Sequence, residues 1–104
     1  MCGNNSDSSS DYFNEKAGIL EGLNKIKEET NELKKESITN YEELVDDLRE
    51  QASDSESAEM VNFLHNLANV LSGVIDSLES DIERSEDEID INEGIIEDFR
   101  SLAD

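Results

Sequence analysis

A chain of 104 residues has room for one small domain, and its lack of proline, tryptophan and long runs of strand-forming residues predicts an all-α fold. Its 28 acidic and 8 basic residues give a net charge of −20, and such a surface repels nucleic acid and anionic lipid. A single cysteine excludes an internal disulfide, and the absence of an 18-residue apolar run excludes a membrane-spanning helix.

The first ten residues hold the only cysteine, Cys2, followed by Gly3 and a tract of Ser, Asn and Asp. This tract has no apolar surface to bury, so we expect residues 1–10 to form a disordered tether. The pattern resembles the start of a mature bacterial lipoprotein, with Met1 standing where a signal segment was removed. The resemblance implies a lipid on Cys2, a location outside the cytoplasm and membrane contact only through that anchor. Without the lipid, the protein would be secreted or cytoplasmic.

Residues 11–104 are predicted to form a single helical domain. A first helix is expected over 11–36, because apolar residues recur there at three- and four-residue spacing: Phe13, Ala17, Leu20, Leu23, Ile26 and Leu33. Residues 37–40 interrupt the pattern, and Asn40 is a good N-cap for a second helix over 41–51. The sequence leaves open whether these two helices are one kinked helix.

Residues 52–57 are the best loop candidate, and Ser53 with Glu56 fits a capping box. A long helix over 57–91 follows, with an apolar stripe of Met60, Leu64, Leu67, Leu71, Val74 and Leu78. Of these, Leu67, Leu71 and Leu78 are expected in the core. After an extra four-residue step the stripe continues to Phe99 and includes Ser85 and Asn92, and Asn92 could fix the helix register. Residues 92–94 offer a stop, so a last helix is predicted over 95–103.

Narrow apolar stripes do not stabilise isolated helices in water, so these helices must pack. The two economical arrangements are an antiparallel helical hairpin and a small three-helix bundle. A homodimer stays open as well, since an intramolecular core and a dimer seam have the same periodicity.

The charge concentrates in residues 76–98, which hold eleven acids and one base. Glu79, Glu83, Glu86 and Asp90 lie three or four residues apart and form the candidate partner-binding face. A solvated, solubilising face is the common explanation of such a run. The alternatives are a surface for a protein partner, which the charge suggests is basic, and an imitation of DNA phosphates that inhibits a basic DNA-binding protein.

The sequence predicts no metal, no cofactor and no catalysis. The segment from Asp90 to Gly94 has its glycine one place too early for a calcium loop and lacks the closing Glu. His65, the only histidine, has no nucleophile or ligand motif near it. We therefore expect a non-enzymatic interaction protein that does not bind nucleic acid directly.

Residues 53–90 also resemble the second half of the WXG100-like helical hairpins exported by type VII secretion. The similarity lies in chain length, the lack of proline and the opening Ser57-Ala58-Glu59. The Trp-x-Gly turn and the Tyr-x-x-x-Asp/Glu export signal of that family are absent. The resemblance implies a secreted hairpin that binds a partner helix pair and requires its C-terminal end near Phe99.

Overall fold

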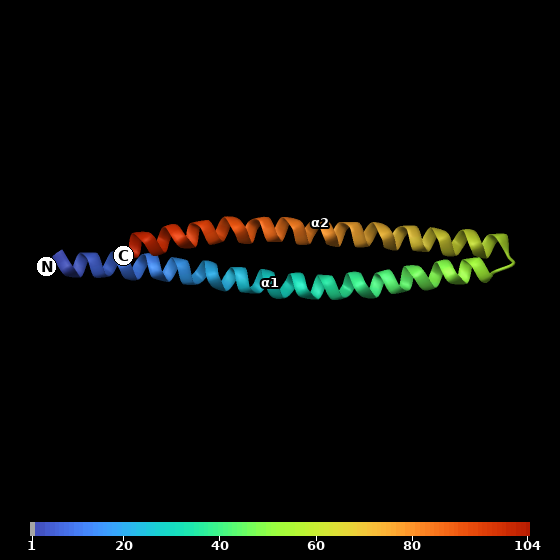
Figure 1. Ribbon diagram of the computed structural model, residues 1–104, viewed down its shortest axis with the longest axis horizontal. Coiled ribbons are helices and arrows are strands. Elements are labelled where there is room, and N and C mark those ends of the chain that lie inside the picture. Colours follow the sequence, from blue (N-terminus) through green and yellow to red (C-terminus); the bar gives the residue numbers. More distant parts are fainter. Residues whose placement is uncertain (1) are drawn as a thin grey trace. The chain divides into compact units, whose positions relative to one another are not determined.

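The computed structural model describes residues 2–104, with side chains from Ser9 onward. It consists of two α-helices, α1 (Cys2–Asp54) and α2 (Ala58–Ala103), which pair as an antiparallel hairpin (Figure 1). This confirms the all-α hairpin. No third helix exists in the described part of the chain, so the three-helix alternative is wrong.

Both predicted interruptions lie inside helices. Residues 37–40 belong to α1, where Ile38 is buried and the Thr39 hydroxyl donates to the Lys35 carbonyl at 3.2 Å. Residues 92–94 belong to α2. Polar residues with weak helix propensity cost only tenths of a kcal/mol each, and without a proline that cost is easily outweighed by packing.

The connection is shorter than predicted and has a different cap. The connection between the helices comprises residues 55–57 alone, and Ser53 is still in α1, its hydroxyl donating to the Arg49 carbonyl at 3.2 Å. Ser57 is the N-cap of α2, because its Oγ accepts from the Met60 amide at 3.3 Å. The predicted capping box of Ser53 and Glu56 is therefore wrong by one helical turn.

The chain divides into two compact units, each containing part of both helices. The loop unit comprises residues 31–83, and its core is apolar. Buried and partly buried side chains alternate along the seam between the helices there: Ile38, Tyr41, Val45, Leu48, Ala68, Leu71, Ile75, Leu78 and Ile82.

The terminal unit comprises residues 1–30 and 84–104, and its seam is more polar. Ala17 and Ile89 are its buried apolar residues among those described, and Asn24 is buried beside them. The Asn92 amide donates to Asn24 Oδ1 at 2.9 Å, and the Asn24 amide donates to the Ile89 carbonyl at 3.4 Å. Asn92 thus lies on the seam, as the sequence indicates, and its partner there is another asparagine.

The buried stripe of each helix is rotated from the predicted one. In α2 the seam uses Val61, Ala68, Ile75, Ile82, Ile89 and Ile96, which repeat every seven residues and need no extra four-residue step. Leu71 and Leu78 pack against the core as expected, but Leu67 is 38% exposed. In α1 the seam passes through Asn24 and Asn31, which leaves Leu23 46%, Ile26 60% and Leu33 64% exposed.

The predicted tether of residues 1–10 falls mostly outside the residues whose side chains are described, so its disorder stays a prediction. Ser9 and Ser10 belong to α1, and the Ser10 hydroxyl donates to the Ala103 carbonyl at 2.8 Å. Within the described residues, neither helix has an apolar stretch long enough to cross a bilayer.

Candidate interaction surfaces

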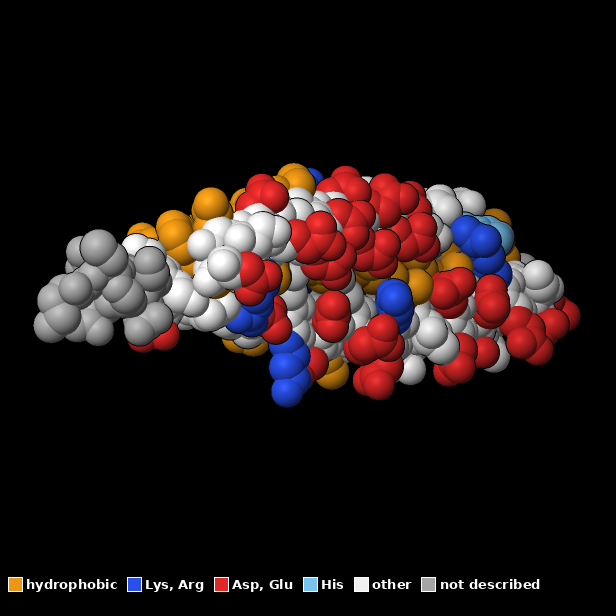
Figure 2. Space-filling view, turned by 60° about the vertical axis from the view of Figure 1, so that its left-hand side comes forward, with side chains coloured by type: hydrophobic (Ala, Val, Ile, Leu, Met, Phe, Trp, Pro, Cys, Tyr) orange, Lys and Arg blue, Asp and Glu red, His pale blue; other side chains and the backbone are white. Residues whose placement is uncertain are grey.

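The four acidic residues singled out by the sequence all lie exposed on α2. Glu79 and Glu83 belong to the loop unit, and Glu86 and Asp90 to the terminal unit. The members of each pair are four residues apart, so each pair lies on one side of the helix. Figure 2 shows acidic side chains gathered over α2. We call these four residues the acidic stripe.

The carboxylates of the acidic stripe form none of the ion pairs identified among the described residues. These pairs include Lys27 with Glu88, Lys34 with Asp81, Lys35 with Glu32 and Arg100 with Glu21. None of them uses a carboxylate of the acidic stripe, although several carboxylates next to it in sequence are paired. The stripe therefore presents charge that this part of the chain does not neutralise.

The Lys27–Glu88 pair has the clearest electrostatic signature. Lys27 Nζ lies 2.7 Å from Glu88 Oε2. The hydrogen bond from Lys27, followed by its positive charge, lowers the pKa of Glu88 below the usual value of 4.5, while burial opposes the shift and Arg84 adds to it. Both side chains are partly exposed, so the pair contributes modestly to stability.

In the terminal unit the acids collect on one flank of the hairpin. Arg100 of α2 binds Glu21 and, at 2.9 Å, the Asn14 side chain, which places these three residues on the same flank. Residues at the same helical phase extend this acidic flank to eight acids and two bases, all exposed: Asp11, Glu21, Glu28, Glu86, Asp90, Glu93, Glu97, Asp104, Lys25 and Arg100.

The opposite flank of the terminal unit is apolar, which sequence reasoning missed. Tyr12, Ile19, Leu23 and Ile26 are exposed on α1, and Ile91, Ile95 and Leu102 are exposed on α2. Spacings of seven, four and three residues place each set on one side of its helix. The seam residues repeat every seven positions from Ala17 in α1 and from Ile89 in α2. In an antiparallel pair, the residues that directly precede these seam positions on the two helices lie on the same flank, so the two exposed sets lie together. We call these seven residues the apolar flank.

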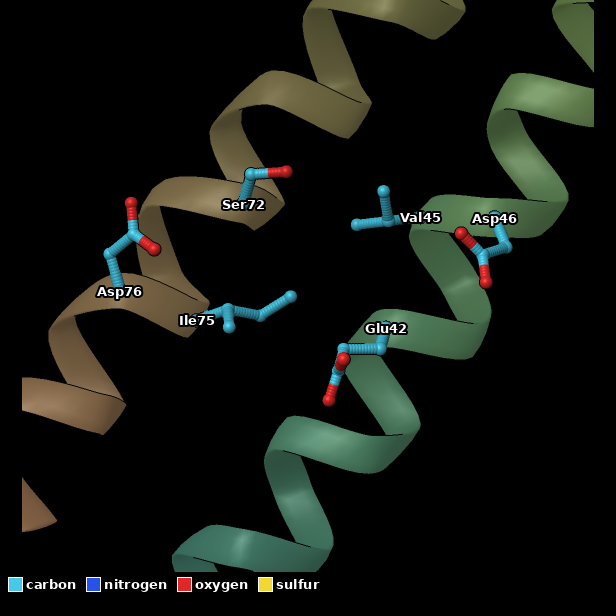
Figure 3. A pocket seen from close by; sticks show the side chains of 6 residues that line it. All are labelled: Glu42, Val45, Asp46, Ser72, Ile75 and Asp76. Carbon is cyan, nitrogen blue, oxygen red and sulfur yellow. The ribbon is translucent and has the colours of Figure 1, made fainter.

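The loop unit contains a shallow cavity between the helices. It has a volume of about 250 Å³ and is lined by Glu42, Val45, Asp46, Ser72, Ile75 and Asp76 (Figure 3). Val45 and Ile75 point across the gap between the helices, and the three carboxylates lie around it. The described residues contain no group of three or more His, Cys, Asp or Glu side chains placed to hold a metal ion.

Two further residues singled out by the sequence are His65 and Cys2, and the structure describes the side chain of His65 only. His65 is exposed on α2, away from the seam. Cys2, the predicted lipid attachment site, lies outside the residues whose side chains are described, so its modification stays a prediction. No protein-family model, curated protein or solved structure matches the chain.

Proposed function

We propose that this protein is a non-enzymatic helical interaction module, held at a membrane surface by a lipid on Cys2, whose acidic stripe binds a basic protein partner. The observation that carries the proposal is the set of exposed carboxylates in the stripe that form no ion pair among the described residues. Unpaired charges of one sign attract an oppositely charged surface and accelerate its association.

The net charge of the chain and the length of the predicted tether also support an anchored protein that binds a protein partner. A net charge of −20 opposes binding to anionic lipid, so the protein surface itself would not lie on such a membrane. The predicted tether of about nine residues would span roughly 15–20 Å as a random coil in place of the first turns of α1. That distance would hold the helices off the headgroups and leave the acidic stripe open to a partner.

The lipid anchor is tested by the intact mass of the protein purified from its native host. We expect a first residue of Cys2 with diacylglycerol attached to its sulfur. A chain that still begins with Met1, or with an unmodified Cys2, would reject the anchor and leave the interaction proposal to be tested separately.

The acidic stripe is tested by neutralising it: Glu79→Gln, Glu83→Gln, Glu86→Gln and Asp90→Asn in one variant. The matched control removes the same charge from α1 through Glu29→Gln, Glu36→Gln, Glu43→Gln and Glu50→Gln. Both variants are cross-linked to native-host envelope proteins, and the captured proteins are quantified by mass spectrometry. We expect the control to retain one basic partner and the stripe variant to lose it. Equal capture of the partner by both variants would show that the stripe only keeps the protein soluble. Displacement of the captured partner by duplex DNA would indicate a DNA mimic.

A second candidate function, a secreted hairpin like the WXG100 group, is favoured by one specific observation. The described chain is a two-helix hairpin whose turn lies at residues 55–57, near mid-chain. Removing residues 99–104 tests this candidate. Loss of export into the culture medium, with retained helicity, would support the secreted hairpin over the anchored module.

A further inference from the structure

We infer that the apolar flank of the terminal unit is the contact surface for a second copy of this chain. The inference is independent of the proposed function, since it concerns the flank opposite the acids. It rests on three properties of the terminal unit: a polar seam, an exposed apolar area of interface size, and a charge pattern that complements itself.

The seam of the terminal unit provides little apolar burial. Ala17 and Ile89 are its buried apolar residues among those described, Phe13 and Phe99 stack at 6.0 Å while only partly buried, and the hydrogen-bonded Asn24 and Asn92 take two further seam positions. Lys27 lies on the same seam and extends to Glu88 at the surface. Small units with so few buried apolar side chains depend on further association for stability.

The apolar flank consists of large hydrophobic side chains that face solvent. Its seven large side chains are between 38% and 62% exposed. At roughly 200 Å² for a fully exposed large residue, they present about 700 Å², close to the ~800 Å² per partner of a standard interface. Monomeric proteins rarely leave an apolar patch of that size uncovered.

The charges on the flank favour a second copy over a basic partner. In a chain of net charge −20, the charges at the phase of this flank are of both signs, Lys16, Arg84, Glu88 and Asp98, and Glu88 is already paired with Lys27 of the seam. A surface with charges of both signs can complement itself across a twofold axis. Pairing two such flanks also directs both acidic flanks outward, which minimises repulsion between copies. A basic partner would instead find its complement on the acidic flank.

The test uses sedimentation equilibrium of the full chain at about 1–100 μM in 150 mM and 500 mM NaCl, conditions in which surface charge is screened. We expect a mass near twice 11.6 kDa, with tighter association at the higher salt concentration. A variant with Ile26→Ser and Ile91→Ser should weaken the dimer by about tenfold or more. The control, Lys25→Ser with Glu93→Ser, changes two exposed residues at the phase of the acidic flank without changing the net charge, and it should leave the dimer unchanged.

Tryptophan fluorescence provides a second readout that does not require destabilising the chain. The protein has no tryptophan, so Ile91→Trp introduces a single probe on the apolar flank and Asn14→Trp introduces a control on the acidic flank. We expect blue-shifted emission from the first probe that moves to longer wavelength on dilution, and no such change for the second. A monomer at every concentration would overturn the inference. A dimer that responds to the acidic-flank variants instead of the apolar-flank variants would also overturn it.

Discussion

At the residue scale, the buried asparagines decide how the helices register. Asn92 donates to Asn24 Oδ1 and Asn24 donates to the Ile89 carbonyl, and a shifted pairing of the helices would break both hydrogen bonds. Asn31 differs, because its Oδ1 is buried without a hydrogen-bond partner among the described residues. Asn24 and Asn92 are therefore joined by a hydrogen bond, whereas the buried acceptor of Asn31 has no partner among the described residues.

Removing one member of the asparagine pair should be costly. Asn92→Ala leaves Asn24 Oδ1 without its donor, and we expect the free energy of unfolding to fall by about 1–3 kcal/mol. The double variant Asn24→Leu with Asn92→Leu should recover that loss, since neither polar group then remains. Urea denaturation measures both. The exposed Asn40→Ala serves as the control and should change stability by less than about 0.5 kcal/mol.

Filling the site of the unpaired acceptor should have the opposite effect. Asn31→Leu removes a buried Oδ1 that has no partner among the described residues. We expect the free energy of unfolding to rise by about 1 kcal/mol or more, measured by the same denaturation. A destabilised Asn31→Leu chain would show that the asparagine amide is the more important part of this side chain.

The Lys27–Glu88 pair predicts a local pH dependence. Because the pKa of Glu88 is lowered in the folded protein, the pair stabilises the fold fully above pH 4.5, and its contribution is lost as the pH falls through the lowered pKa. Lys27→Met should return the pKa of Glu88 toward 4.5, as followed by NMR titration of its side-chain carbon. Lys35→Met, which removes a cation paired with Glu32, should leave the pKa of Glu88 unchanged.

At the element scale, the continuity of α1 through residues 37–40 is the testable feature. Asn40→Pro removes a backbone donor and places a ring against the preceding turn, so we expect a loss of about 3 kcal/mol and reduced helicity. Glu56→Pro, in the connection, is the matched control. Circular dichroism and thermal unfolding compare the two. Similar stability for both variants would mean that α1 is already interrupted near residue 40.

The sequence predicts the all-α hairpin and seam residues such as Leu71 and Leu78, but its apolar stripes also include residues that the structure leaves exposed. In α2, Met60, Leu67 and Val74 lie on one side of Leu64 and Leu71, whereas Val61, Ala68 and Ile75 lie on the other. Size favours the first set, yet the second continues through Ile82 and Ile89 without a change of period. Counting hydrophobic residues cannot distinguish two adjacent stripes. The seven-residue repeat that continues without a break along α2 is the signal that would have distinguished them.

The same ambiguity concealed part of the candidate surface. The four residues of the acidic stripe could be selected because charge runs are visible in sequence, and all four are exposed. The apolar flank could not be selected from the sequence, because Leu23 and Ile26 have the spacing of core residues. Only the structure shows that Asn24 takes the buried position. Polar residues on a seam are a tertiary property that depends on the partner helix.

At the scale of the whole molecule, a net charge of −20 makes the folded chain repel itself. Raising NaCl from about 10 mM to about 500 mM should increase the melting temperature by several degrees, because the Debye length shortens below the spacing of many surface charges. The Ile26→Ser, Ile91→Ser variant is the right background, since weakened self-association then contributes little. The α1 variant with four neutralised acids should show a smaller increase. An unchanged or falling melting temperature would contradict this prediction.

The hydrogen bond from Ser10 to Ala103 joins two residues that are 93 positions apart, and it has a practical consequence for labelling. A reporter or affinity tag fused after Asp104 would sit beside Ser10, where it could obstruct the apolar flank. Residues 55–57 are the better insertion point. The same proximity makes circular permutation feasible, with a short peptide joining residue 103 to residue 10 and new ends opened between the two helices.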